Sequence, residues 1–108
     1  MKDEKIGEGG AGEKYGHVPG HQYDDVDVTI YLLGAGGYRV DVAHTAGSAQ
    51  GYDEEHERTE VSGWGDDIAA AVAEAKDNAI AAGIEQEHLI PALCKARREA
   101  EEKSTAAP

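Results

Sequence analysis

Apolar and polar residues alternate along two consecutive stretches of the chain, residues 25–33 and 38–45. A repeat of two residues is typical of a β-strand with one buried face and one face in water. The intervening residues 34–37 are Gly-Ala-Gly-Gly, and glycine supplies the positive φ that a tight turn needs. The pattern therefore predicts an antiparallel hairpin. The residues expected on its buried face include Val26, Val28, Ile30, Val40 and Val42.

A third strand is predicted at residues 57–62, where the β-branched residues Thr59 and Val61 occupy alternate positions. It would follow an acidic loop at residues 46–56, because two glycines interrupt the alternation there. These three strands would form an antiparallel meander.

Apolar residues take up a helical spacing after Trp64. Asp66 and Asp67 suit a first turn, because carboxylates are stabilised at the positive end of the helix dipole, and Gly83 is expected to end the helix. The apolar face is mostly alanine, which suits close packing of the helix on a sheet. Its expected members are Ile68, Ala71, Val72, Ala75, Ala79 and Ala82.

A second helix is predicted to begin at Pro91, where the missing N–H costs nothing, and to continue over residues 92–103. Cys94 falls on its apolar stripe and is expected to be a small buried side chain. The preceding residues 84–90 allow either a loop or a single helical turn.

Together these elements predict an α+β fold. We expect a three-stranded antiparallel sheet with one face covered by the alanine-rich helix, plus a C-terminal helix. Residues 1–24 are rich in glycine and poor in apolar side chains, so they are predicted to be a flexible acidic arm. Residues 25–103 would then form a single β-β-β-α-α domain, and residues 104–108 a disordered tail.

The charge and composition narrow the classes of function. The chain has 108 residues and a net charge of −12, which argues against binding nucleic acid through its phosphates. No stretch approaches the roughly 18 consecutive apolar residues of a membrane span, and the first residues lack the apolar stretch of a signal peptide. One cysteine excludes an internal disulfide framework. We therefore expect a cytoplasmic protein that uses no cofactor.

The densest acidic stretch runs from residue 53 to residue 60 and contains Asp53, Glu54, Glu55, Glu57 and Glu60. Such a stretch either keeps a loop solvated or docks a basic protein, because complementary charge accelerates and selects an encounter. An inhibitor that mimics DNA belongs to the second interpretation.

Trp64 is the only tryptophan and lies between two glycines. It is expected to fill the core beneath the helix. The alternative is that it faces solvent, where it would anchor a partner.

Two groups of histidines suggest other functions. His17 and His21, near acidic residues, could hold a metal ion such as zinc, although a glycine and a proline between them exclude helical spacing. Asp41, His44 and His56 could form an acid–base group at a subunit interface, although Asp41 and His44 should face opposite sides of their strand. Neither group forms a recognised catalytic set.

Two short motifs carry a family resemblance. A Gly-Gly-Tyr-x-Val run at residues 36–40 and a Gly-Asp corner at residues 65–66, followed by an alanine-rich helix, are similar to motifs of HicB-like antitoxin domains. The resemblance covers residues 26–83 and implies a partial RNase-H-like fold of three strands and a helix, with a protein toxin as partner. Many members also carry a C-terminal DNA-binding segment, whereas residues 84–108 are short and carry no excess of basic residues.

The sequence thus favours a small acidic interaction module over an enzyme. Its partner would be a basic protein, such as a toxin or a nucleic-acid enzyme, or a second copy that pairs through an exposed strand edge. A homo-oligomer is expected, since a core of this size is small. Metal or small-ligand binding at His17 and His21 is the alternative, and catalysis at a subunit interface is the third hypothesis.

Overall fold

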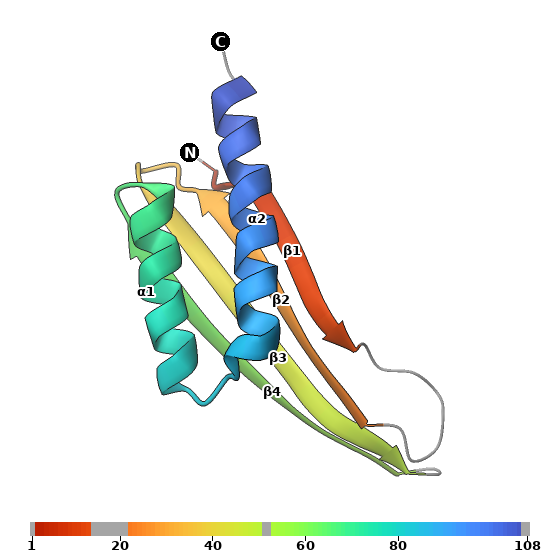
Figure 1. The fold of residues 1–108 in the computed structure, drawn as a ribbon. Helices are drawn as coiled ribbons and strands as arrows, with labels where there is room; N and C mark the ends of the chain where they lie inside the picture. Colours follow the sequence, from red (N-terminus) through yellow and green to blue (C-terminus); the bar gives the residue numbers. More distant parts are fainter. Residues whose placement is uncertain (1, 14–21, 51–52, 107–108) are drawn as a thin grey trace.

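The computed structural model describes residues 2–13, 22–50 and 53–106 of the chain. Four strands precede two helices, and all four strands belong to one antiparallel sheet, so the predicted α+β class is confirmed (Figure 1). The elements are β1 (Glu4–Glu13), β2 (Gln22–Leu32), β3 (Tyr38–Gln50), β4 (Asp53–Gly65), α1 (Ile68–Ala81) and α2 (Gln86–Ala106).

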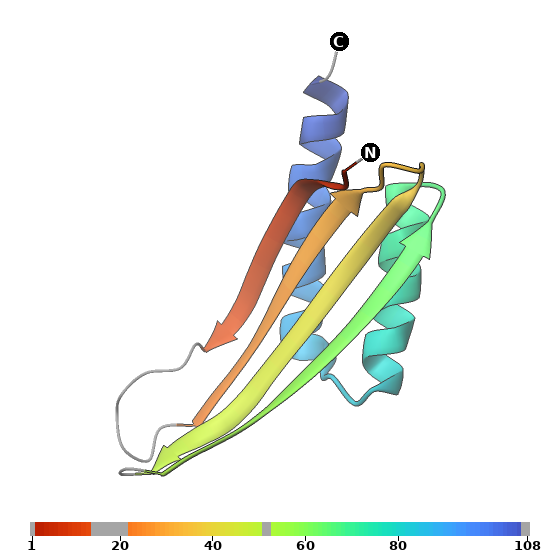
Figure 2. The same ribbon diagram turned by 180° about the vertical axis from the view of Figure 1, so that it is seen from behind.

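Each strand pairs with its neighbour in the chain, in the order β1-β2-β3-β4, so β1 and β4 are the two edges of the sheet. Both helices lie on the same face, α1 against β4 and β3, and α2 against β1 and β2. The opposite face has no helix over it (Figure 2). At one end β2, β3 and β4 continue past both helices, which leaves that part of the sheet without a helical layer on either face.

The predicted hairpin of β2 and β3 is confirmed. Ile30 lies opposite Val40 in the register. The turn is closed by a hydrogen bond from the Leu33 amide to the Gly37 carbonyl, at 3.0 Å. Gly36 and Gly37 have φ values of 102° and 82°, which explains why the turn requires glycine.

The expected three-stranded sheet is wrong in one strand, because β1 forms from residues assigned to the flexible arm. Its pairing with β2 runs from Glu4 to Glu13. Gly7 and Gly9 lie so close to α2 that a Cβ on either would overlap the helix backbone. Apart from the buried Ile6, β1 therefore meets α2 largely through glycines, and a search for apolar side chains misses such a strand.

The predicted acidic loop at residues 46–56 is also wrong. β3 continues to Gln50 and β4 begins at Asp53, which pairs with Gln50. The predicted third strand at residues 57–62 is confirmed but forms only the middle of β4. Ladder hydrogen bonds join backbone groups, so pairing with β3 continues where the side-chain alternation fails.

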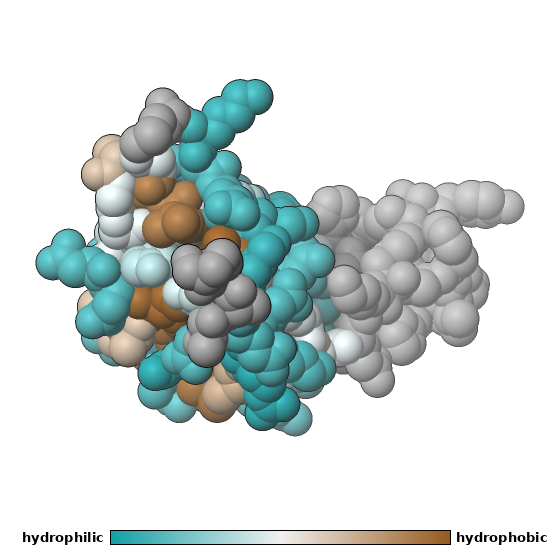
Figure 3. All heavy atoms as spheres, turned by 90° about the horizontal axis from the view of Figure 1, so that it is seen from above, coloured by the Kyte–Doolittle hydropathy of each residue, from teal (hydrophilic) through white to brown (hydrophobic). Residues whose placement is uncertain are grey.

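The core lies between the sheet and the two helices. The middle strands supply β-branched side chains and the helices supply mostly alanine, while Gly63 and Gly65 of β4 pack against Ala75 and Ala71 of α1. Figure 3 shows the end of the molecule at which α1 begins and α2 ends. Apolar residues reach the surface there between hydrophilic ones. The buried apolar residues are Ile6, Val26, Val28, Ile30, Val40, Val42, Ile68, Ala71, Val72, Ala75, Ala79, Ile84, Leu89, Ala92, Leu93, Ala96 and Ala100.

The first helix begins and ends close to the predicted residues. Asp67 is the N-cap, and its side chain accepts a hydrogen bond from the Ala70 amide at 2.7 Å. After the C-cap Ala82, Gly83 adopts a φ of 92°. The predicted apolar face is buried except for Ala82, which is exposed because the helix has already ended there.

The second helix differs more from the prediction. It begins at Gln86, so Pro91 lies inside it rather than at its start. Leu89 is fully buried, and its burial holds the turn that precedes the proline. Cys94 is exposed, because the buried stripe passes through Leu93 and Ala96 on either side of it. The helix also continues to Ala106, into the predicted disordered tail.

Candidate functional site

All six residues that the sequence indicates for partner binding lie on one strand, β4, at an edge of the sheet. The backbone of Asp53, Glu54 and Glu55 is part of β4, whereas their side chains lie outside the described part of the structure. Glu57 and Glu60 are exposed. At about 3.3 Å per residue, the strand spreads these positions along its length instead of gathering them into one patch.

Trp64 does not fill the core. Its neighbours Gly63 and Gly65 both pack against α1, so the alternation of the strand directs Trp64 to the opposite, helix-free face. There it is 52% exposed. Its position corresponds to the solvent-facing alternative of the sequence analysis, in which it serves as a binding anchor.

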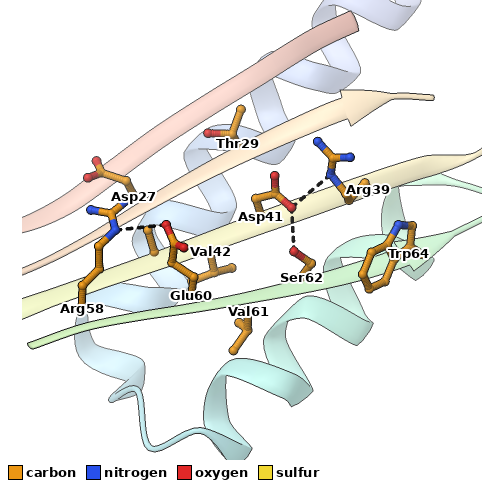
Figure 4. A pocket seen from close by; sticks show the side chains of 11 residues that line it. Asp27, Thr29, Arg39, Asp41, Val42, Arg58, Glu60, Val61, Ser62 and Trp64 are labelled. Atoms are coloured by element: carbon orange, nitrogen blue, oxygen red, sulfur yellow. Dashed lines mark hydrogen bonds and ion pairs between the residues drawn. The ribbon is translucent and has the colours of Figure 1, made fainter. Parts of the chain in front are cut away.

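Beside Trp64, Arg39 of β3 is held by three groups. Its guanidinium lies 4.5 Å from the centre of the Tyr31 ring, its Nε lies 3.1 Å from a carboxylate oxygen of Asp41, and its Nη1 donates to Asp3 at 3.5 Å. The Ser62 hydroxyl donates to Asp41 at 2.7 Å. Figure 4 shows Arg39, Asp41, Ser62 and Trp64 around a depression of about 530 Å³ on the helix-free face.

Further along the same depression, Arg58 and Glu60 form an ion pair with 3.0 Å between Nε and Oε1. Asp27 of β2 lines the depression as well. Carboxylates of three strands therefore meet on this face, next to an exposed indole. A lysine or arginine side chain would find both a carboxylate and an aromatic ring there.

Side chains from the helices cover backbone carbonyls at both edges of the sheet. Asn78 of α1 donates to the Ser62 carbonyl of β4 at 2.8 Å. On the other edge, Lys95 and Lys103 of α2 donate to the carbonyls of Gly10 and Lys5 on β1, at 3.2 and 3.4 Å. These contacts satisfy groups that would otherwise invite another strand.

The proposed acid–base group does not assemble. His44 points to the helix side of the sheet, where its Nε2 lies 2.6 Å from a carboxylate oxygen of Asp24, while Asp41 lines the depression on the other face. The side chain of His56 is outside the described residues. His44 is thus a hydrogen-bonded residue at the rim of the core, as strand alternation indicates.

The metal hypothesis concerns residues beyond the described part of the structure. His17 and His21 both lie in residues 14–21. Within residues 2–13, 22–50 and 53–106, no three His, Cys, Asp or Glu side chains gather as ligands for a metal ion. Metal binding at the two histidines stays a prediction.

Away from β4, Arg97 and Glu101 pair on α2 at 2.7 Å. This hydrogen bond raises the pKa of Arg97 above its usual value. The pair stabilises the exposed side of α2 and takes no part in the candidate site.

Comparisons with known proteins assign no family: no family model, curated protein or solved structure matches the chain. No helix in the described part of the chain is long and apolar enough to cross a membrane.

The sequence analysis missed Arg39 and Tyr31 as site residues. Tyr31 and Arg39 lie opposite each other in the β2–β3 register, and their side chains point to the same face as that of Asp41. Applying the two-residue repeat to the polar residues as well would have placed all three on one face.

Proposed function

We propose that this protein is an interaction module that binds a basic protein partner along β4, with Trp64 as an aromatic anchor. The observation that carries the proposal is the position of β4. It is an edge strand, its Glu57 and Glu60 side chains are exposed, and Glu60 and the half-exposed Trp64 line one depression.

The charge of the protein favours this kind of partner. With a net charge of −12, the chain attracts basic surfaces, and complementary charge raises the rate of encounter. An extended segment can pair Lys or Arg side chains with Glu57 on one face of β4 and pack its alternate side chains against Trp64 on the other face. The resemblance of residues 26–83 to HicB-like antitoxins makes a basic toxin in the cytoplasm one partner of this chemistry.

A peptide titration tests the proposal. The probe is a twelve-residue peptide of alternating Lys and Val, long enough to span β4, and its counterpart with Glu in place of Lys is the control. We expect the basic peptide to bind in calorimetry, to change the fluorescence of the single tryptophan, and to be released by high salt. The acidic peptide should not bind.

Matched variants locate the site. Glu57→Gln with Glu60→Gln should weaken binding of the basic peptide, and Trp64→Ala should weaken it further. Glu99→Gln with Glu102→Gln removes the same charge from exposed positions of α2 and should leave binding unchanged. Equal losses in the β4 and α2 variants would show nonspecific attraction and overturn the proposal.

A further inference from the structure

The two edges of the sheet are covered to different extents. α2, with 21 residues, is about 31 Å long and matches the roughly 33 Å of β1 with its 10 residues. α1 has 14 residues and is about 21 Å long, whereas the 13 residues of β4 extend over about 43 Å. About half of β4 therefore has no helix beside it, as Figure 1 also shows.

The covered half of β4 is the half that leads into α1. Gly63 and Gly65 pack against this helix, and Asn78 reaches the carbonyl of Ser62. The uncovered part lies towards Asp53 and falls within residues 53–60.

The direction of each backbone group on β4 follows from the register. The amide of Leu33 donates to the carbonyl of Gly37, so in the same register the odd-numbered residues of β3 direct their backbone groups to β2. The even-numbered residues of β3 therefore direct theirs to β4. Val40 pairs with Gly63, so odd-numbered residues of β4 face β3 and even-numbered residues face outward. The hydrogen bond from Asn78 to Ser62, an even-numbered residue, agrees with this assignment.

We infer that a basic partner segment binds by joining the sheet as an additional strand along residues 53–60 of β4, an inference that rests on the proposed function. In this stretch the outward backbone groups belong to Glu54, His56, Arg58 and Glu60. A row of outward N–H and C=O groups is a template for an extended chain. The added strand would pair in the plane of the sheet, beyond the reach of α1.

The acidic residues along the uncovered stretch favour a basic partner segment. Asp53, Glu55 and Glu57 occupy alternate positions of the uncovered stretch. Side chains of paired strands lie directly opposite one another, and opposite charges in such pairs are stabilising. The partner segment is therefore extended and carries Lys or Arg at every second position.

The same pattern opposes pairing with a second copy of this chain. A two-fold axis at Glu57 would set this residue against itself and Glu54 against Glu60. An axis at His56 would set Glu55 against Glu57, while pairing Glu54 with Arg58. Both arrangements place like charges opposite one another, which is destabilising.

Peptides with methylated backbone nitrogens distinguish strand addition from simple attraction between charges. The probe is an eight-residue peptide of alternating Lys and Val, equal in length to residues 53–60. Two further forms carry N-methyl groups on every Lys or on every Val. In an added strand one of these sets faces β4 and the other faces solvent. One form should bind at least about tenfold more weakly, and the other should match the unmodified peptide.

Hydrogen exchange supplies a second readout on the whole protein. The unmodified peptide should protect the amides of Glu54, His56, Arg58 and Glu60. The amides of Glu57 and Thr59, which already face β3, should change little.

The outcomes separate this inference from the proposed function. Equal binding of all three peptides, or loss of binding by both methylated forms, would overturn strand addition and leave the basic partner in place. Failure of the unmodified eight-residue peptide while the twelve-residue peptide binds would also overturn it. Failure of both unmodified peptides would overturn the proposed function itself.

Discussion

The side-chain amide of Asn78 on α1 donates a hydrogen bond to the backbone carbonyl of Ser62 on β4, over 2.8 Å. This contact lies in the last turn of α1, which ends at Ala81. Beyond it, towards Asp53, the outward backbone groups of the strand have no helix beside them. The part of the edge beside α1 is therefore covered, and the part towards Asp53 is the one proposed to accept a partner.

Replacing Asn78 by Ala should destabilise the fold relative to replacing Asp77 by Ala. Both changes substitute alanine for a poor helix former at exposed neighbouring positions, so the difference combines the bond to Ser62 with the removal of the Asp77 charge near the C-terminus of α1. We expect Asn78→Ala to be less stable than Asp77→Ala by about 0.5–1.5 kcal/mol in urea unfolding. Equal stability of the two variants would mean that water replaces the amide without loss.

Replacing Gly63 by Ala should be far more costly than replacing Gly10 by Ala. A Cβ at Gly63 would overlap the backbone of Ala75, which cannot move without displacing α1. We expect a loss of about 1–3 kcal/mol or more in the free energy of unfolding. A Cβ at Gly10 would come close to the side-chain oxygen of Asp27, at 2.9 Å, and make an ordinary contact of 3.6 Å with the Val26 carbonyl, so no backbone atom would have to move. Similar losses in the two variants would contradict the close packing of α1 on β4.

Replacing Trp64 by Ala should change stability little, since the side chain is half exposed on the helix-free face. We expect a loss of about 1 kcal/mol or less, against about 2–5 kcal/mol for Leu89→Ala in the core. In the unaltered protein, acrylamide should quench Trp64 fluorescence efficiently. Weak quenching together with a large loss of stability would mean that the Trp64 side chain is buried in the core in solution.

His44 and Asp24 should be energetically coupled. Their 2.6 Å contact lies at the rim of the core, with side-chain exposures of 19% and 40%. A double-mutant cycle with His44→Ala and Asp24→Ala should give an interaction of about 0.5–1.5 kcal/mol. Additive losses would show that the two side chains do not interact in solution.

The candidate site was predictable in its residue types and not in its arrangement. Six positions on β4 follow from the acidic run and the single tryptophan. Their distribution along one edge required the register, because residues 53–56 have no alternation that predicts a strand. Whether Trp64 faced the core or solvent was also open, until the packing of Gly63 and Gly65 on α1 settled its direction.

The sequence by itself determined the β2–β3 hairpin, the extent of the α1 helix from just after Asp67 to Gly83, and the α+β class. These features arise from local patterns: alternation, helical spacing and residues that tolerate special backbone angles. Tertiary structure alone decided that β1 joins the sheet, that β4 extends to Asp53, and that α2 begins before Pro91. In each case the stabilising contacts come from residues distant in sequence, namely backbone pairing, glycine against helix, and burial of Leu89.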